Sequence, residues 1–268
     1  MSRKRLGQHF LTQTDVAERI VDEAQVGPED LVIEIGPGRG ALTEHLVSRA
    51  AGVVAVEVDP GLARAASDRF GSDGGIEVVE GDVLSVSFEP LITARGHRRA
   101  ILLANIPYRI TGRLIDHVLT QADCWRHAVL MVQREVADRL VAAPGGKDYG
   151  LLTIATRLRS QAGRLFDVRP DAFDPPPKVH SSVVRLGFEG YARPDVRNER
   201  LLFMVARACF QRRRKMIRNS LSGITPDTEA VLEAAGIVGT SRPETLSIDD
   251  FERVCRAIEE ARGARVDR

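Results

Sequence analysis

Short runs of Val, Ile and Leu alternate with longer amphipathic segments through the first 160 residues of the chain. Continuous apolar runs of this length are typical of parallel strands that are buried on both faces. Segments with helical spacing separate them, at residues 41–50, 61–70 and 111–121. The alternation predicts a doubly wound α/β sheet with strands LVIEIG (31–36), GVVAVEV (52–58), IEVVEGD (76–82), AILLAN (100–105) and AVLMVQ (128–133), and SSVVRLGF (181–188) as a late strand that closes it.

The chain changes character near residue 190. The segment EGYARPDVRNER (189–200) is polar and rich in turn-forming residues, which predicts a linker. Every segment after about residue 199 has helical spacing. Because 268 residues exceed the length of most single domains, we expect an α/β domain over residues 1–190 and a small helical domain over residues 191–268.

The composition excludes several classes of protein. Hydrophobic residues make up 43% and charged residues 28%, as in a soluble globular enzyme. No apolar run reaches the roughly 18 residues of a membrane span, and the N-terminus lacks the apolar core of a signal peptide. The three cysteines are far apart, which argues against a disulfide framework or a zinc site. We expect a monomer in a reducing cytoplasm, with no membrane association and no metal.

A glycine-rich turn, EIGPGRGA, follows the first strong strand and opens a helix. Gly36, Gly38 and Ala41 fit the pattern that lets a nucleotide-type ligand approach the backbone closely. Glu57 ends the second strand, where a carboxylate can accept both hydroxyls of a ribose. A glycine turn that serves packing alone would show the same letters. The two candidate ligands are a nicotinamide or flavin dinucleotide and S-adenosylmethionine, because each contains an adenosine ribose.

Asp82 ends the third strand in EGDVL. A carboxylate at this place can accept a hydrogen bond from an adenine amino group, which is common in methyltransferases. Asp is equally suited to cap a helix, so Asp82 does not decide between the two ligands by itself. The segment after the fourth strand decides between them.

The segment Asn105-Ile106-Pro107-Tyr108 fits the signature of methyltransferases that act on exocyclic amino groups. The lone pair of an adenine amino nitrogen is delocalised into the ring, so acceptors must hold its two hydrogens and favour a pyramidal nitrogen. The side-chain carbonyl of Asn105 and the backbone carbonyl of Ile106 are the expected acceptors, and Pro107 stiffens the turn by fixing φ. Tyr108 is expected to stack on the base, a contact worth about 1–3 kcal/mol.

A base inside a duplex must be extruded to reach such a site, so we expect a second aromatic side chain to sandwich it. Phe173 is the candidate, in the proline-rich segment DAFDPPPKVHSS. An ordinary core position is the competing interpretation for Phe173. For NIPY itself, the competing interpretation is a strand-ending turn with Tyr108 as a packing residue. Glu57 and Asp82, at ordered spacings upstream, argue against it.

Seven motifs, in order along nearly the whole chain, resemble the ribosomal RNA adenine dimethylases of the KsgA type. They are RLGQHFL (5–11), EIGPGRGALT (34–43), NIPY (105–108), VQREVADRL (132–140), KDYGLL (147–152), FDPPPKVHSSVVRL (173–186) and FQRRRKMIRNSL (210–221). The last two motifs are the more specific. The resemblance implies a Rossmann-like S-adenosylmethionine-dependent methyltransferase domain with a small C-terminal helical domain.

The resemblance also implies an activity and a set of site residues. The activity is dimethylation of two adjacent adenosines near the 3′ end of 16S rRNA, within the small ribosomal subunit or its precursor, from S-adenosylmethionine. The implied base-handling residues are Asn105, Tyr108 and Phe173. His9 stands where many members of the family have Asn, and Ile106 stands where Leu is usual. The implied cofactor contacts are His9, Leu11, Gly36, Glu57, Asp82 and Asn105.

A basic segment in the second half of the chain fits an RNA substrate. Residues 207–218 contain six basic side chains and no acidic one, and such a cluster can neutralise phosphates. A solvated helix face is the competing interpretation. Arg3, Lys4 and Arg5 are expected to add to the same surface. The expected RNA-binding residues are Arg207, Arg212, Arg213, Arg214, Lys215 and Arg218.

Three other functions stay open. An adenine methyltransferase of the macrolide-resistance type, which acts on large-subunit rRNA, shares the glycine turn and NIPY. A non-catalytic ribosome-assembly factor would have no physical need for Glu57, Asp82, Asn105 and Tyr108. A dinucleotide-dependent oxidoreductase would bind NADH and not S-adenosylmethionine.

Overall fold

The computed structural model describes residues 9–71 and 75–266, which form two compact units. The first unit extends to Ala137 and resumes over Arg159–Tyr191. The second unit consists of Asp138–Leu158 and the residues from Ala192 onward.

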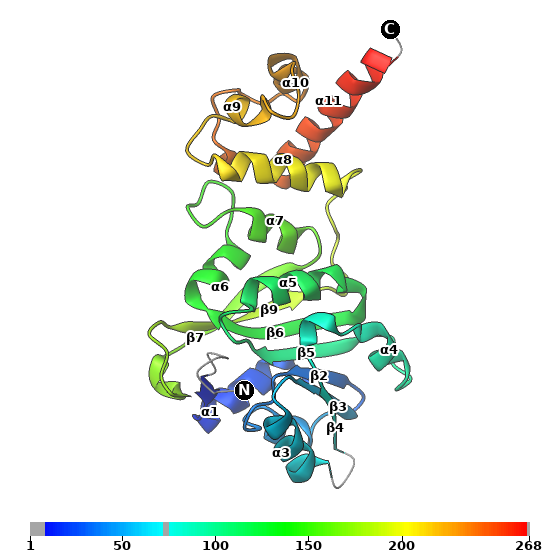
Figure 1. Ribbon diagram of the computed structural model, residues 1–268, viewed down its shortest axis with the longest axis vertical. Helices are drawn as coiled ribbons and strands as arrows, with labels where there is room; N and C mark the ends of the chain where they lie inside the picture. Colours follow the sequence, from blue (N-terminus) through cyan, green and yellow to red (C-terminus); the bar gives the residue numbers. More distant parts are fainter. Residues whose placement is uncertain (1–8, 72–74, 267–268) are drawn as a thin grey trace. The chain divides into compact units, whose positions relative to one another are not determined.

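The first unit is built on a seven-stranded sheet with the order β4-β3-β2-β5-β6-β9-β7 (Figure 1). The five strands from β4 to β6 are parallel, and β9 is antiparallel to both of its neighbours. Strand order reverses between β2 and β5, so the loops after these strands diverge and leave a crevice at their carboxyl ends. The strands are β2 (Leu31–Ile35), β3 (Gly52–Glu57), β4 (Ile76–Glu80), β5 (Ala100–Asn105), β6 (Trp125–Gln133), β7 (Gln161–Val168) and β9 (Ser181–Gly187).

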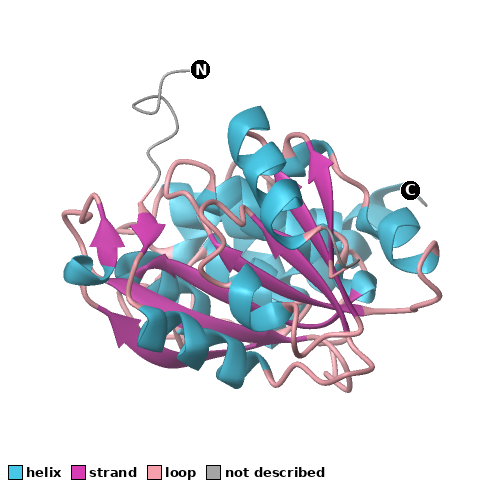
Figure 2. Ribbon diagram, turned by 90° about the horizontal axis from the view of Figure 1, so that it is seen from below, coloured by secondary structure: helices cyan, strands magenta, loops and turns pink. Residues whose placement is uncertain are grey.

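Amphipathic helices cover the sheet, as the view in Figure 2 shows. Helix α1 (Thr14–Ala24) buries Ile20 and Val21 in one core cluster with Val32, Ile101 and alternate residues of the other central strands. This spacing follows from the period of two in a strand, which sends successive side chains to opposite faces. The remaining helices of this unit are α2 (Thr43–Leu46), α3 (Pro60–Phe70), α4 (Phe88–Thr93) and α5 (Thr111–Thr120), and α6 (Arg134–Val141) runs from it into the second unit.

Two short strands form a separate antiparallel ladder, β1 (Phe10–Leu11) with β8 (Phe173–Asp174). Leu11 is paired with Phe173, and Phe10 with Asp174. The ladder brings the start of the described chain beside a segment more than 160 residues further along.

The second unit is helical. Its helices are α7 (Leu151–Arg157), α8 (Glu199–Gln211), α9 (Ile217–Leu221), α10 (Thr228–Ala234) and α11 (Ile248–Val266). They enclose one core, to which α8 contributes Leu202 and Val205, and α11 contributes Phe251 and Ile258.

The predicted α/β sheet followed by helices is present, but the units do not divide the chain at residue 190 alone. Residues 138–158 precede that boundary and belong to the second unit. The reason is burial, because Tyr149, Ile154 and Leu158 are at most 2% exposed within the helical core. Sequence patterning also missed β7, an edge strand in which only Val168 is fully buried and the apolar residues do not alternate regularly.

Candidate active site

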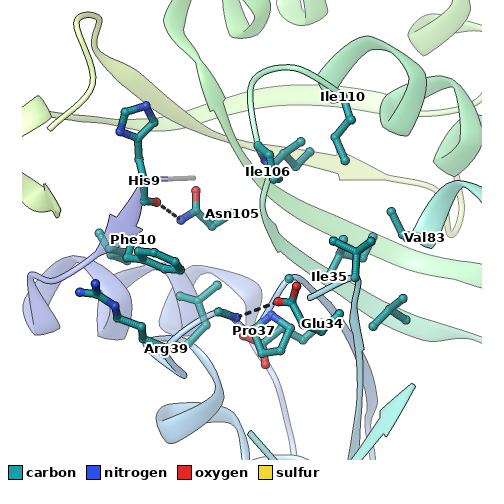
Figure 3. A pocket seen from close by; sticks show the side chains of 18 of the residues that line it. His9, Phe10, Glu34, Ile35, Pro37, Arg39, Val83, Asn105, Ile106 and Ile110 are labelled. Carbon is teal, nitrogen blue, oxygen red and sulfur yellow. Dashed lines mark hydrogen bonds between the residues drawn. The ribbon is translucent and has the colours of Figure 1, made fainter. Parts of the chain in front are cut away.

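A pocket opens at the carboxyl ends of β2, β3 and β5, where the strand order reverses (Figure 3). Ten of the eleven expected catalytic and cofactor-binding residues line it, and Phe173 does not. The ten are His9, Leu11, Gly36, Gly38, Glu57, Asp82, Asn105, Ile106, Pro107 and Tyr108.

The glycine turn after β2 requires its glycines. Gly36, Gly38 and Gly40 have φ of +69°, +55° and +86°, a region that side chains with a Cβ rarely adopt. A Cβ at Gly38 would lie 3.2 Å from the ring of Phe10, whereas one at Gly36 would meet nothing within 4 Å. The backbone at Gly36 therefore borders open space in the pocket.

Glu57 is fixed at the end of β3 although it is only 2% exposed. Its Oε2 accepts a hydrogen bond from the amide of Gly38 at 3.3 Å, and its Oε1 accepts one from the amide of Asp59 at 2.9 Å. Burial raises the pKa of Glu57, and these backbone donors oppose the rise. The carboxylate is thus tied to the glycine turn and forms part of the pocket lining.

Sequence reasoning missed Glu34, which lines the same pocket from the next-to-last position of β2. It is 1% exposed, and its Oε2 accepts a hydrogen bond from Thr43 Oγ1 at 2.7 Å. Burial first, and the nearby charge of Glu57 second, raise the pKa of Glu34 to about 7. The available signal was an acidic residue inside an otherwise apolar strand, LVIEI.

Asp82 takes the capping role, one of the two between which the sequence could not choose. Its Oδ1 accepts a hydrogen bond from the amide of Leu84 at 3.0 Å and caps the short 3₁₀ helix Val83–Ser85. Asp82 is also exposed and lines the pocket.

Asn105, the last residue of β5, has a defined side-chain orientation. Its Nδ2 donates a hydrogen bond to the backbone carbonyl of His9 at 3.3 Å, drawn as a dashed line in Figure 3. Because the amide nitrogen points toward the His9 carbonyl, the amide oxygen points away from it. The side chain therefore presents an acceptor beside the pocket.

The rest of NIPY forms a firm turn. The amide of Ile106 donates to the carbonyl of Met131 at 3.2 Å, which extends the pairing of β5 with β6 by one residue. The carbonyl of Pro107 accepts from the amide of Ile110 at 3.0 Å and from Thr111 Oγ1 at 3.3 Å. Because the carbonyl of Pro107 already accepts two hydrogen bonds, it is a poorer acceptor for a ligand than the carbonyl of Ile106.

Tyr108 is half-buried at the pocket mouth. Its hydroxyl is hydrogen-bonded to Ser181 Oγ at 2.8 Å. The ring of His9 lies beside it, with 5.5 Å between the ring centroids and 33° between the planes. Burial raises the pKa of the Tyr108 phenol, so the hydroxyl stays protonated.

Phe173 is not among the residues that line the pocket. It is 4% exposed and belongs to the core cluster that also contains Val168 and Val183. The reason is its pairing with Leu11, since directly opposed residues of an antiparallel ladder point to the same face. In this structure Phe173 packs in that core cluster, as in the competing interpretation, and its role as a sandwiching aromatic stays a prediction.

The basic segment spans the end of α8, the following turn and the start of α9. Five of its side chains are exposed, namely Arg207, Arg212, Arg214, Lys215 and Arg218. Gln211, Asn219 and residues 212–215 line an open groove there. Arg213 differs, because it is half-buried, donates to the carbonyl of Gly146 at 3.0 Å and lies 3.9 Å from a carboxylate oxygen of Glu244. Arg3, Lys4 and Arg5 lie outside the described residues.

Within residues 9–71 and 75–266, no helix is both long enough and apolar enough to cross a membrane. No group of three His, Cys, Asp or Glu side chains in the same ranges is arranged to hold a metal ion. The three cysteines, Cys124, Cys209 and Cys255, are buried free thiols.

Comparison with known proteins gives a consistent result. A profile of the family described as ribosomal RNA adenine dimethylase matches residues 1–260. A ribosomal RNA small subunit methyltransferase A from Pelotomaculum thermopropionicum is 42% identical over 97% of this chain and 92% of its own length. The protein of the same name from Pseudomonas fluorescens is 40% identical over 94% of this chain and 92% of its own length.

Solved structures give the same picture. A dimethyladenosine transferase from Plasmodium falciparum superposes with a TM-score of 0.79 at 26% identity, over 94% of this chain and 98% of that one. The 23S rRNA methyltransferase ErmE superposes with a TM-score of 0.70 at 27% identity, over 93% of this chain and 99% of that one.

Proposed function

Because the chain belongs to the ribosomal RNA adenine dimethylase family, we propose that it dimethylates two adjacent adenosines near the 3′ end of 16S rRNA in the small ribosomal subunit. The membership confirms the family predicted from the motifs. Relatives at about 40% identity over more than nine-tenths of the chain carry the small-subunit name, which supports the choice of substrate. The observation that carries the proposal is the Asn105 amide, held with its oxygen as an acceptor in the same pocket as Glu57 and Asp82.

S-adenosylmethionine is the proposed methyl donor, and the pocket fits it. The open space in front of Gly36 admits a ligand against the backbone. Glu57 would accept hydrogen bonds from the ribose hydroxyls, and Asp82 would accept one from the adenine amino group. When bound, the cofactor supplies a methyl group on a positively charged sulfur, a carbon already activated for transfer. His9, Leu11, Gly38 and Asn105 would complete the cofactor wall.

The residues of the NIPY turn would prepare the target amine. Asn105 Oδ1 and the carbonyl of Ile106 would each accept one hydrogen of the amino group, which keeps its lone pair directed into the pocket. Tyr108 would stack on the extruded base. Ile106 and Leu11, both at most 5% exposed, present apolar side chains that exclude water from this end of the pocket. Holding the two reactants in this way is worth about 7–11 kcal/mol in favourable cases.

The exposed residues of the basic segment are proposed to contact rRNA phosphates. They are Arg207, Arg212, Arg214, Lys215 and Arg218. Arg213 is engaged within its own unit and is the weakest of the expected contacts. We further propose that the protein acts as a monomer in the cytoplasm. Light scattering after size exclusion tests the monomeric state, and cell fractionation tests the cytoplasmic location.

Nucleoside mass spectrometry tests the activity. The protein is given S-adenosylmethionine and unmethylated small or large ribosomal subunits in parallel reactions. Dimethyladenosine as an adjacent pair in small-subunit rRNA is the expected product. Methylation restricted to the large subunit would instead support an activity of the kind named for ErmE, to which the fold is also similar. Binding of the subunit without any product would support an assembly factor. Tight binding of NADH, without binding of S-adenosylmethionine, would indicate an oxidoreductase.

A further inference from the structure

A hydrogen bond joins Tyr108, which follows β5, to β9, which lies two strands from β5 in the sheet. The Tyr108 hydroxyl and Ser181 Oγ are 2.8 Å apart although the two residues are 73 positions apart in the chain. We propose that Ser181 is a positioning residue that fixes the ring of Tyr108 for stacking on the target adenine. This inference rests on the proposed function and assigns a residue that the NIPY motif does not contain.

Ser181 is a rigid anchor. It is the first residue of β9 and is paired on one side with Gln133 of β6 and on the other with Val168 of β7. Its side chain is 1% exposed. Backbone pairing on both sides and burial leave the hydroxyl little freedom to move.

Tyr108, in contrast, lies in a turn and is half-buried. Rotation about its two side-chain torsions would change the plane that a base meets. The hydroxyl is at the end of the side chain furthest from the backbone, so a bond there fixes the first torsion and the direction of the ring axis. The Ser181 bond thereby sets the position of the ring, and the neighbouring His9 ring limits its rotation about that axis.

The same restraint reaches the acceptor of the target amine. The imidazole of His9 lies beside the Tyr108 ring, and its Nδ1 donates to the carbonyl of Pro175 at 2.6 Å. The backbone carbonyl of His9 accepts the hydrogen bond from Asn105 Nδ2. The stacking ring and the amide acceptor are thus held against one another through a single residue.

Loss of the Ser181 hydroxyl is expected to slow catalysis more than it weakens subunit binding. Phosphate contacts supply most of the affinity of a protein for nucleic acid, and they lie elsewhere on this chain. Misplacement of a reacting group by a fraction of an ångström lowers the rate steeply. We expect kcat to fall about tenfold, the factor for one lost hydrogen bond, with KM for the subunit almost unchanged.

A double-mutant cycle tests the inference. Ser181→Ala, Tyr108→Phe and the double variant are compared with the wild-type protein for kcat and KM on unmethylated small subunits. Because Tyr108→Phe already removes the hydroxyl that Ser181 holds, we expect Ser181→Ala to have no further effect in that background. A purely structural role for Ser181 would give the same additional loss in both backgrounds and would overturn the inference.

Ser182→Ala is the matched control. Ser182 is the next residue of β9, is also buried, and its hydroxyl donates to Asp167 and not to Tyr108. We expect this variant to retain wild-type kcat, and thermal melts of both variants show whether folding is preserved. An unchanged kcat for Ser181→Ala would refute the positioning role while the proposed function stands. A wild-type protein that leaves small-subunit rRNA unmethylated would refute both.

Discussion

The Asn105 side chain is oriented before any ligand is bound, since its amide nitrogen is already used by the His9 carbonyl. We expect Asn105→Ala to lower methyl transfer by at least about 10²-fold, as for the loss of one group that stabilises a transition state. Cofactor affinity should change far less, because Glu57 and Asp82 remain. Single-turnover methylation and calorimetric titration with S-adenosylmethionine measure the two effects. Near-normal turnover would remove Asn105 from the reacting centre.

Glu34 makes the stability of the free protein depend on pH. Its pKa is raised from 4.5 to about 7 in the folded state, so the folded protein binds the proton more tightly than the unfolded chain does. The free energy of unfolding therefore falls as pH rises above 4.5, and the whole cost, up to about 3 kcal/mol, is present above pH 7.

Glu34→Gln removes this titration and keeps an acceptor for the Thr43 hydroxyl. We expect the variant to be more stable than the wild type at pH 8 and to differ much less at pH 4.5. Denaturant melts at the two pH values measure the difference. An equal effect at both would mean that the pKa of Glu34 is not raised in the folded protein.

At the scale of one element, the glycines of the turn have two different roles. Gly40 is needed for packing against Phe70, and Gly36 leaves space for a ligand. Gly36 and Gly40 both have positive φ, but a Cβ at Gly40 would lie 2.6 Å from the ring of Phe70. We expect Gly40→Ala to be less stable than Gly36→Ala by about 1–3 kcal/mol, the usual cost of overpacking. We expect Gly36→Ala to bind S-adenosylmethionine more weakly, because its Cβ would project into the pocket. Denaturant melts and calorimetry separate the two outcomes, and equal stabilities would contradict the assigned contact.

Charge reversal tests whether the basic segment binds RNA. The residues to change are ones for which no side-chain bond within their own unit is described above. Arg214→Glu and Lys215→Glu are each expected to weaken binding to the small subunit. Each should also reduce the slope of log K against log salt by about 1, as for one lost phosphate contact. Arg200→Glu, at the opposite end of α8, is the control of equal charge. Equal slopes for all three variants would place the RNA surface elsewhere.

At the scale of the whole molecule, the helical unit includes a segment that the chain supplies before β7. Tyr149, Ile154 and Leu158 are buried in the same core as α8, α10 and α11. Loss of a large buried side chain costs about 2–5 kcal/mol, and a folded domain has only about 5–15 kcal/mol in total.

We therefore expect a fragment of residues 192–268 not to fold alone. Circular dichroism with thermal melting is the measurement, and the full chain is the reference. A cooperative melt of the fragment would show that residues 138–158 are dispensable for this core.

The sequence by itself determined the fold class, the pocket and most of its wall. Some features depend only on residues that are close in the chain, so they can be recognised from the sequence. They are the apolar runs of strand length, the glycine turn and the proline-stiffened turn. The match to the ribosomal RNA adenine dimethylase family confirms the family that the motifs predicted.

Only the tertiary structure decided what depends on residues far apart in the chain. The pairing of β1 with β8 buries Phe173, and the contact with Gly146 engages Arg213. Burial beside Glu57 keeps Glu34 partly protonated near neutral pH, and the packing of β9 brings Ser181 to Tyr108. In each case the environment of a side chain depends on a partner that is distant in the sequence. The residues next to it in the chain do not indicate which partner that is.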